Sequence, residues 1–132
     1  MAELEDIVIE GSHKNFFTPN VNFNLQTGIC EISGESFLEN TVEFYQPLID
    51  WLKVYTDEIK RPLAFIIKLT YYNTSTSRCL LDILNIIKEY EESDGEVVVN
   101  WHYDENDIDM EEDIEDYMID TGLKINLIPE SE

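Results

Sequence analysis

The sequence predicts an α/β fold, a single-layer mixed β-sheet of four to five strands with about three helices. Short segments alternate apolar and polar residues, as half-buried strands do, and longer ones repeat apolar residues every three or four positions, as helices do. The two kinds of segment alternate along the chain, which implies right-handed crossovers and parallel neighbouring strands. The 132 residues, 43% of them hydrophobic, fit a single domain covering residues 1–132.

A β-hairpin is predicted near the N-terminus. Residues 5–10 form a short apolar run that is typical of an edge strand. Residues 21–25 and 29–33 each alternate apolar and polar side chains, and Thr27-Gly28 between them indicates a turn. We therefore expect the second and third of these segments to pair with each other.

The first helix is predicted to follow this hairpin. Asn40-Thr41-Val42-Glu43 resembles a capping box, in which an acceptor side chain is followed three residues later by Glu. Apolar residues then recur at helical spacing to about Ile59. Pro47 lies inside this pattern and predicts either a kink or a later start of the helix.

The second half of the chain alternates strands and helices. Residues 63–71 are rich in β-forming side chains and predict a central strand covered on both faces. Residues 80–90 carry a second helical face, and 96–103 predict another strand. Residues 110–121 predict a third helix, and 123–128 a last short strand.

Charge and composition exclude several classes of protein. The formal net charge of −21 argues against binding to nucleic acid or to an anionic membrane surface, both of which attract clustered Lys and Arg. The acidic N-terminus does not resemble a signal peptide, and no apolar run approaches the roughly 18 residues of a membrane span. We therefore expect a cytoplasmic protein in which Cys30 and Cys79 are buried thiols.

Four consecutive hydroxyl side chains stand between the central strand and the second helix. They are Thr74, Ser75, Thr76 and Ser77, preceded by Tyr72-Asn73. One interpretation is ordinary N-capping, in which one hydroxyl accepts from backbone N–H groups and the others face water. The other is a phosphorylation site, because a phosphate there would meet free N–H groups and the positive end of the helix dipole. The residues alone leave both open.

A strongly acidic stretch runs from Asp104 to Asp120, with ten Asp or Glu residues and no Lys or Arg. Asp107 and Asp109 invite comparison with a calcium loop, but no Gly stands where that loop turns sharply. The stretch is interpreted either as a solvated acidic surface or as a docking surface for a basic partner. It predicts no metal site.

Nothing in the sequence predicts catalysis. His102 stands between Trp101 and Tyr103 on a predicted strand, with only His13 as a second histidine, so we interpret it as structural. The sequence has no glycine-rich phosphate loop and no pairing of a nucleophile with a base. We therefore expect no enzymatic activity and no cofactor.

Three ordered blocks of the chain resemble the SiaC family of bacterial regulatory phosphoproteins. The first runs over residues 34–52, the second over residues 69–83, and the third over residues 101–110. The resemblance spans roughly residues 15–128. Leu38 departs from the family pattern, where Pro is expected, and this affects the entry into the first helix.

The resemblance implies a partner-switching protein whose fold is similar to that of anti-sigma-factor antagonists. In the family, a Ser/Thr kinase phosphorylates the segment at the start of the second helix and a PP2C-type phosphatase removes the phosphate. The unphosphorylated protein binds and activates an effector, a diguanylate cyclase. Carried over to this sequence, the modified residue is Thr74, with Ser75 and Thr76 as alternatives. The expected partner-binding residues are Tyr72, Asn73, Ser75, Ser77, Asp107 and Asp109.

Overall fold

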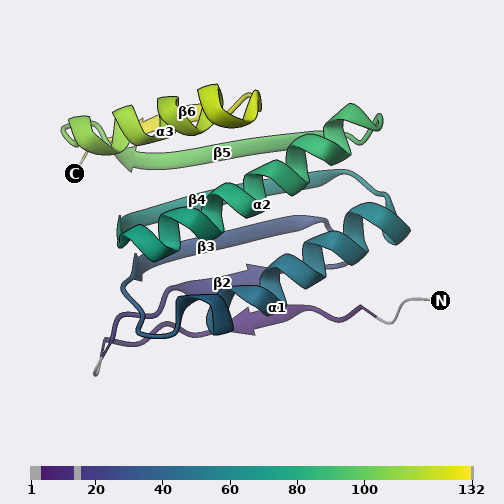
Figure 1. The fold of residues 1–132 in the computed structure, drawn as a ribbon, viewed down its shortest axis with the longest axis horizontal. Helices are drawn as coiled ribbons and strands as arrows, with labels where there is room; N and C mark the ends of the chain where they lie inside the picture. Colours follow the sequence, from purple (N-terminus) through teal and green to yellow (C-terminus); the bar gives the residue numbers. More distant parts are fainter. Residues whose placement is uncertain (1–3, 14–15, 132) are drawn as a thin grey trace.

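The computed structural model, which describes residues 4–13 and 16–131, is built on one six-stranded sheet (Figure 1). The strands lie side by side in sequence order. They are β1 (Ile7–Ile9), β2 (Asn20–Phe23), β3 (Ile29–Ser36), β4 (Leu63–Tyr72), β5 (Val97–Asp104) and β6 (Asn126–Glu130). The first three strands pair antiparallel, and β3 to β6 pair parallel, so the sheet is mixed as predicted.

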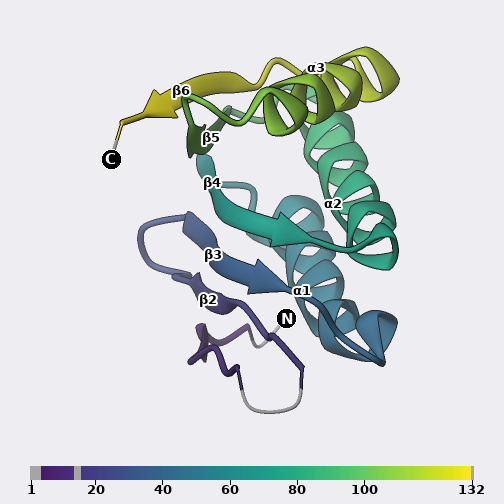
Figure 2. The ribbon, with the colours of Figure 1, turned by 90° about the vertical axis from the view of Figure 1, so that its left-hand side faces the viewer.

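All three helices lie on the same face of this sheet (Figure 2). They are α1 (Thr41–Val54), which continues into a π-helical turn η1 (Tyr55–Ile59), α2 (Thr74–Glu92) and α3 (Ile108–Thr121). Each helix follows one of the parallel strands β3, β4 and β5. The N-termini of the helices therefore gather at the end of the sheet where these strands finish (Figure 1).

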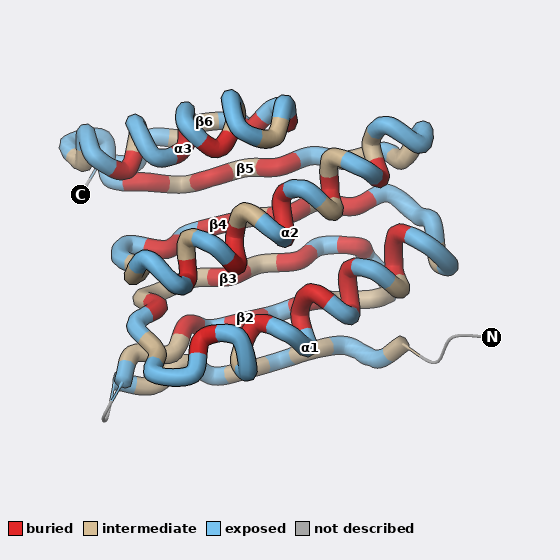
Figure 3. The backbone as a smooth tube through the Cα atoms, in the orientation of Figure 1, coloured by how far each residue is buried: buried red, intermediate tan, exposed pale blue. Residues whose placement is uncertain are grey.

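The hydrophobic core fills the layer between the sheet and the helices (Figure 3). Along β4 the side chains alternate in burial, and Phe65 and Ile67 are fully buried on the helix side. Trp101 of β5 is also fully buried. On the opposite face of the sheet the described residues place no helix, and there Ile29 and Val98 are about half exposed. The prediction that 63–71 is covered on both faces was therefore wrong, since helices cover one face only.

The predicted number of four to five strands was also wrong, because the sheet has six. Short strands were predicted at residues 5–10 and 123–128, and β1 and β6 overlap these segments with three and five residues. The error therefore lies in the number of strands assigned to the sheet and not in the presence of these two segments. Their positions are fixed by pairing with distant segments, Ile7 opposite Phe23 and Leu127 opposite Trp101.

The first helix starts at Thr41, directly after the position that the capping pattern indicated, and Pro47 lies inside the helix and does not delay its start. Asn40 is the N-cap residue, but its side chain makes no capping hydrogen bond, so the predicted capping box is not formed. Pro47 costs the helix one backbone hydrogen bond. We attribute its tolerance to the buried residues on either side, Tyr45 and Leu48, which anchor this part of α1 in the core.

The remaining elements follow the predictions closely. The hairpin of β2 and β3 is present, with Gly28 at its turn in a left-handed conformation (φ 73°). The second and third helices begin earlier than their apolar patterns, at Thr74 and Ile108. Cys30 and Cys79 are buried free thiols, as predicted. Among the described residues, no helix is long and apolar enough to cross a membrane.

Candidate functional site

The start of α2 is held by Asn73, which directly follows β4. Its extended backbone (φ −86°, ψ 174°) turns the chain from strand to helix. The Asn73 N–H donates to the Ser36 carbonyl at 3.1 Å. Its side-chain oxygen accepts from the Thr76 N–H at 3.0 Å, from the Thr76 hydroxyl at 2.7 Å and from the Ser75 hydroxyl at 3.2 Å. This cap satisfies donors that no helical carbonyl reaches, and it fixes the geometry of the junction.

Thr76 belongs to a buried network of hydroxyl groups beneath this junction. Thr76, Ser36 and Tyr45 each have 0% exposed surface. The Ser36 Oγ lies 2.8 Å from the Thr76 Oγ1 and 2.9 Å from the Tyr45 hydroxyl. Burial raises the pKa of Tyr45, which keeps its hydroxyl neutral. Phosphorylation of Thr76 would require this network to open.

Two further hydroxyls connect α2 to its neighbouring helices. The Ser75 Oγ lies 2.8 Å from the Thr41 Oγ1 and joins α2 to the start of α1. The Ser77 Oγ lies 2.6 Å from the Tyr117 hydroxyl and joins α2 to α3. The first contact joins the starts of two helices, and the second joins the first turn of α2 to the second half of α3.

Thr74 differs from the other three hydroxyl residues. It is the first residue of α2, and it is exposed. Within the part of the chain that the structure describes, its hydroxyl makes no hydrogen bond, whereas Ser75, Thr76 and Ser77 all do. Among the four, Thr74 is therefore the hydroxyl that can be modified without breaking a contact of the fold.

Tyr72 connects the same junction to α3. Its ring packs against Trp101 with the centroids 6.2 Å apart, and its hydroxyl donates to the Asp113 Oδ2 at 3.0 Å. Burial is the first cause of the raised pKa of Tyr72, and the neighbouring carboxylate of Asp113 adds to it. Trp101 in turn stacks on Tyr117 at 5.4 Å. Tyr72 is thus half-buried and has a structural role in addition to any contact with a partner.

The acidic stretch separates into structural and solvent-facing carboxylates. Asp107 is the N-cap of α3, and its side chain accepts from the Met110 N–H at 3.0 Å. Glu111 accepts from the Tyr103 hydroxyl at 3.3 Å. Asp109 is exposed in the first turn of the helix. In the described residues no three His, Cys, Asp or Glu side chains are placed to hold a metal ion.

Exposed apolar side chains also lie near the α2 start, and sequence reasoning did not identify them. Phe37 is 44%, Tyr71 48% and Val42 67% exposed. The Phe37 and Tyr71 rings lie 6.3 Å apart. The β3–β4 register shifts after Gly34, so that Glu35 pairs with Tyr71 and not with the preceding residue. A pattern of strict alternation does not reveal such a shift, but the φ of +97° at Gly34 explains why glycine stands there.

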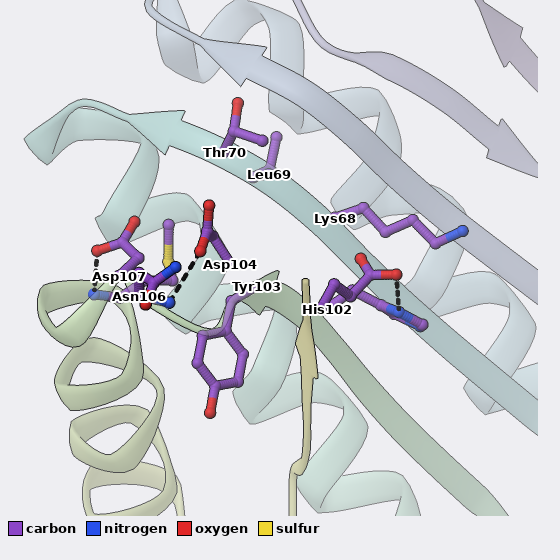
Figure 4. Close-up of a pocket in the computed structure, with 10 residues that line it drawn as sticks. Lys68, Leu69, Thr70, His102, Tyr103, Asp104, Asn106 and Asp107 are labelled. Atoms are coloured by element: carbon purple, nitrogen blue, oxygen red, sulfur yellow. Dashed lines mark hydrogen bonds and ion pairs between the residues drawn. The ribbon is translucent and has the colours of Figure 1, made fainter. Parts of the chain in front are cut away.

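A groove of about 520 Å³ lies beside this junction, between the ends of β4 and β5 (Figure 4). The pairing of these strands stops at Ile67 and Trp101, and the strands separate beyond that point. The polar groups along the groove come from β4, β5, β6 and the residues before α3. They include Lys68, Thr70, His102, Asp104, Asp107 and Glu130.

Most charges of the groove already have partners within the fold. The Lys68 Nζ lies 3.4 Å from the Glu31 carboxylate on the open face of the sheet. The His102 Nδ1 lies 3.6 Å from the Glu130 carboxylate (Figure 4), which is too long for a hydrogen bond, and it makes no other hydrogen bond. His102 is half-buried on β5, and its structural role stays a prediction. The groove therefore does not suggest a catalytic arrangement.

Comparisons with known proteins agree with this geometry. A model of the family described as "SiaC family regulatory phosphoprotein" matches residues 9–130. An uncharacterized protein of Pseudomonas aeruginosa strain UCBPP-PA14 is 32% identical over 101 residues, which cover 76% of this chain and 78% of that protein.

Solved structures show the same fold. Apo-SiaC from Pseudomonas aeruginosa superposes with a TM-score of 0.85 at 28% identity, covering 95% of this chain and 99% of that one. SiaC of the same organism has also been solved in complex with the diguanylate cyclase SiaD, of which it is the activator. That structure matches with a TM-score of 0.83 at 26% identity, covering 92% of this chain and 100% of that one. The chain belongs to the SiaC family of regulatory phosphoproteins.

Proposed function

We propose that this protein is a non-catalytic signalling adaptor whose binding to an effector protein is switched by reversible phosphorylation of Thr74. The observation that carries the proposal is the state of the four hydroxyls at the start of α2. Thr74 is exposed and its hydroxyl is free within the described structure, whereas Ser75, Thr76 and Ser77 hold the fold together. In a related SiaC the effector is a diguanylate cyclase, and we propose the same class of effector here.

The chemistry of the switch requires two partner enzymes. A Ser/Thr kinase would transfer the γ-phosphoryl group of ATP to the Thr74 Oγ1, releasing ADP and the hydroxyl proton. A PP2C-type phosphatase would hydrolyse the phosphate ester with water, restoring the hydroxyl and releasing inorganic phosphate. The phosphate adds a charge of about −1.5 to −2 at neutral pH.

The surface around Thr74 is suited to sensing this charge. Phe37, Tyr71 and Val42 are exposed near the start of α2, and aromatic side chains are common anchors in protein interfaces. A phosphate buried against an apolar or acidic partner surface is strongly unfavourable unless it is paired. Phosphorylation would therefore release a partner that occupies this surface.

The first experiment is intact-mass measurement and site mapping of the protein purified from its own cells. We expect a species heavier by one phosphate, with the modification on Thr74. Mapping of the phosphate to Ser75 or Thr76 would overturn the assignment of Thr74 while leaving the switch itself in place. Failure to find a phosphorylated species under any growth condition would count against the switch.

The second experiment compares the binding of variants to the diguanylate cyclase of the same organism. We expect Thr74→Glu to bind at least about tenfold more weakly than wild type, and Thr74→Val to bind as wild type does. Asn85→Glu is the matched control, because it adds the same charge at another exposed position of α2. Equal affinity of Thr74→Glu and wild type would contradict the proposal.

A second candidate is a constitutive module that docks a basic partner through residues 104–120. It is favoured by the exposed carboxylates of α3, which include Asp109, Glu112, Glu115 and Asp116. It predicts binding that weakens steeply with salt and is indifferent to Thr74→Glu. Joint neutralisation of Asp109, Glu112 and Asp116 tests it without removing the Asp107 cap or the Glu111 contact with Tyr103.

A further inference from the structure

Cationic residues are scarce in the segments of the sequence that surround Thr74. The segments 37–52, 69–87 and 104–123 hold the first turns of the three helices together with the ends of β4 and β5. In all of them there is a single Lys or Arg, which is Arg78. Within these three segments, Arg78 is therefore the cationic side chain available to a negative charge on Thr74.

Arg78 stands four residues after Thr74 on the same helix. Both side chains are exposed. Residues four apart lie on the same helix face, with Cβ atoms about 5–6 Å apart, and an anion placed N-terminal to a cation is the favourable order. Arg78 makes no ion pair within the described part of the chain, whereas Lys88, further along α2, lies 3.1 Å from Glu91. The guanidinium of Arg78 is thus free for a new partner.

The other charged groups near Thr74 would repel a phosphate. Glu39 and Glu43 line a small hollow together with Ser75, the residue that follows Thr74. Asp113 holds the hydroxyl of Tyr72 on the α3 side of the junction. A phosphate on Thr74 therefore enters acidic surroundings, where a nearby cation favours its doubly charged form.

We propose that Arg78 is the intramolecular counter-ion of the phosphate on Thr74. This inference rests on the proposed phosphorylation of Thr74 and adds which side chain of the same protein pairs with the phosphate. The planar guanidinium can donate two parallel hydrogen bonds to the phosphate oxygens, which Lys cannot do. In the unmodified protein Arg78 presents a positive charge beside Thr74. After phosphorylation the pair carries a net negative charge, so the charge that Thr74 and Arg78 together present to a partner changes sign.

The test is a phosphorus NMR titration of protein in which phosphothreonine is incorporated at position 74 during synthesis. The unperturbed second pKa of such a phosphate is about 6. We expect the pKa in the otherwise wild-type chain to be lower than in Arg78→Gln by roughly 0.15–0.4 units, the scale of an exposed pair at this spacing. Arg78→Lys is expected to lie between them. Lys88→Gln removes the same charge from the same helix and is expected to leave the pKa unchanged.

Two results would overturn the inference. One is the same phosphate pKa in the Arg78→Gln and wild-type chains. The other is an equal rise in Lys88→Gln, since this would report only the total charge of the protein. The Arg78 variants change an exposed side chain, and far-ultraviolet circular dichroism checks that each remains folded. Because the phosphate is introduced chemically, the titration is independent of whether cells phosphorylate Thr74, and mass mapping decides that point separately.

Discussion

The starts of α2 and α3 are built alike but present different surfaces. Each follows a parallel strand at the same end of the sheet, and each is capped by a short polar side chain. Asn73 accepts from the Thr76 N–H and Asp107 from the Met110 N–H, both at 3.0 Å. The first turn of α2 contains no acidic residue, whereas that of α3 contains two.

The difference explains why one of two similar junctions is suited to a switch. Carboxylates at the start of α3 need no modification to interact with the positive end of that helix. The hydroxyls at the start of α2 are neutral and gain charge only by modification. The third residue of each helix also differs, because Thr76 joins a buried hydroxyl network while Met110 packs as an apolar side chain.

The largest predicted effect on stability concerns the third residues of the two helices, Thr76 and Met110. Thr76→Val keeps the shape but removes the hydroxyl, so Ser36 and Asn73 each lose one buried hydrogen bond. We expect it to lower the free energy of unfolding by about 2–3 kcal/mol. Met110→Leu, at the matching position of α3, is expected to cost less than about 1.5 kcal/mol. Urea denaturation measures both. Equal losses would show that the hydroxyl network has no special role.

The next prediction compares the two capping residues. Asn73→Ala should cost about 2 kcal/mol and Asp107→Ala about 1 kcal/mol, within the range for N-cap removal. The larger loss at Asn73 is expected because its side chain also accepts from the hydroxyls of Thr76 and Ser75. The same denaturation series tests this. A greater loss for Asp107→Ala would contradict our expectation that the Asn73 cap contributes more to the free energy of unfolding.

Sequence patterns predicted most of this fold because long elements carry their own periodicity. The alternation along β4 and the repeated apolar face of α2 are examples. The prediction was wrong where contacts between elements decide the structure. The last strand was predicted over 123–128, but pairing with β5 places β6 at Asn126–Glu130. The helix start at Thr41 was indicated by the sequence, but the predicted side-chain cap at Asn40 does not form.

The candidate site was predicted less completely than the fold. The hydroxyl segment was recognised from its composition and from the family resemblance, but its residues alone did not rank Thr74 above its neighbours. That ranking needs the partners Ser36, Thr41 and Tyr117, which come from three other elements. The outward turn of Tyr71 was also missed, since a register shift beside Gly34 produces it.

The smallest predicted effect concerns Tyr72, whose hydroxyl connects β4, just before α2, to Asp113 of α3. Its pKa is raised in the folded protein, chiefly by burial, relative to about 10 in the unfolded chain. A raised pKa means that the folded state favours the neutral phenol, so this contribution to stability is complete below pH 10 and is lost as the pH rises above it. For one group the slope is at most about 1.4 kcal/mol per pH unit, and less for a partly exposed ring. Denaturation between pH 9 and about pH 11 should therefore show a smaller alkaline loss for Tyr72→Phe than for wild type. Identical profiles of stability against pH for wild type and Tyr72→Phe would show that the Tyr72 hydroxyl does not contribute to the alkaline loss.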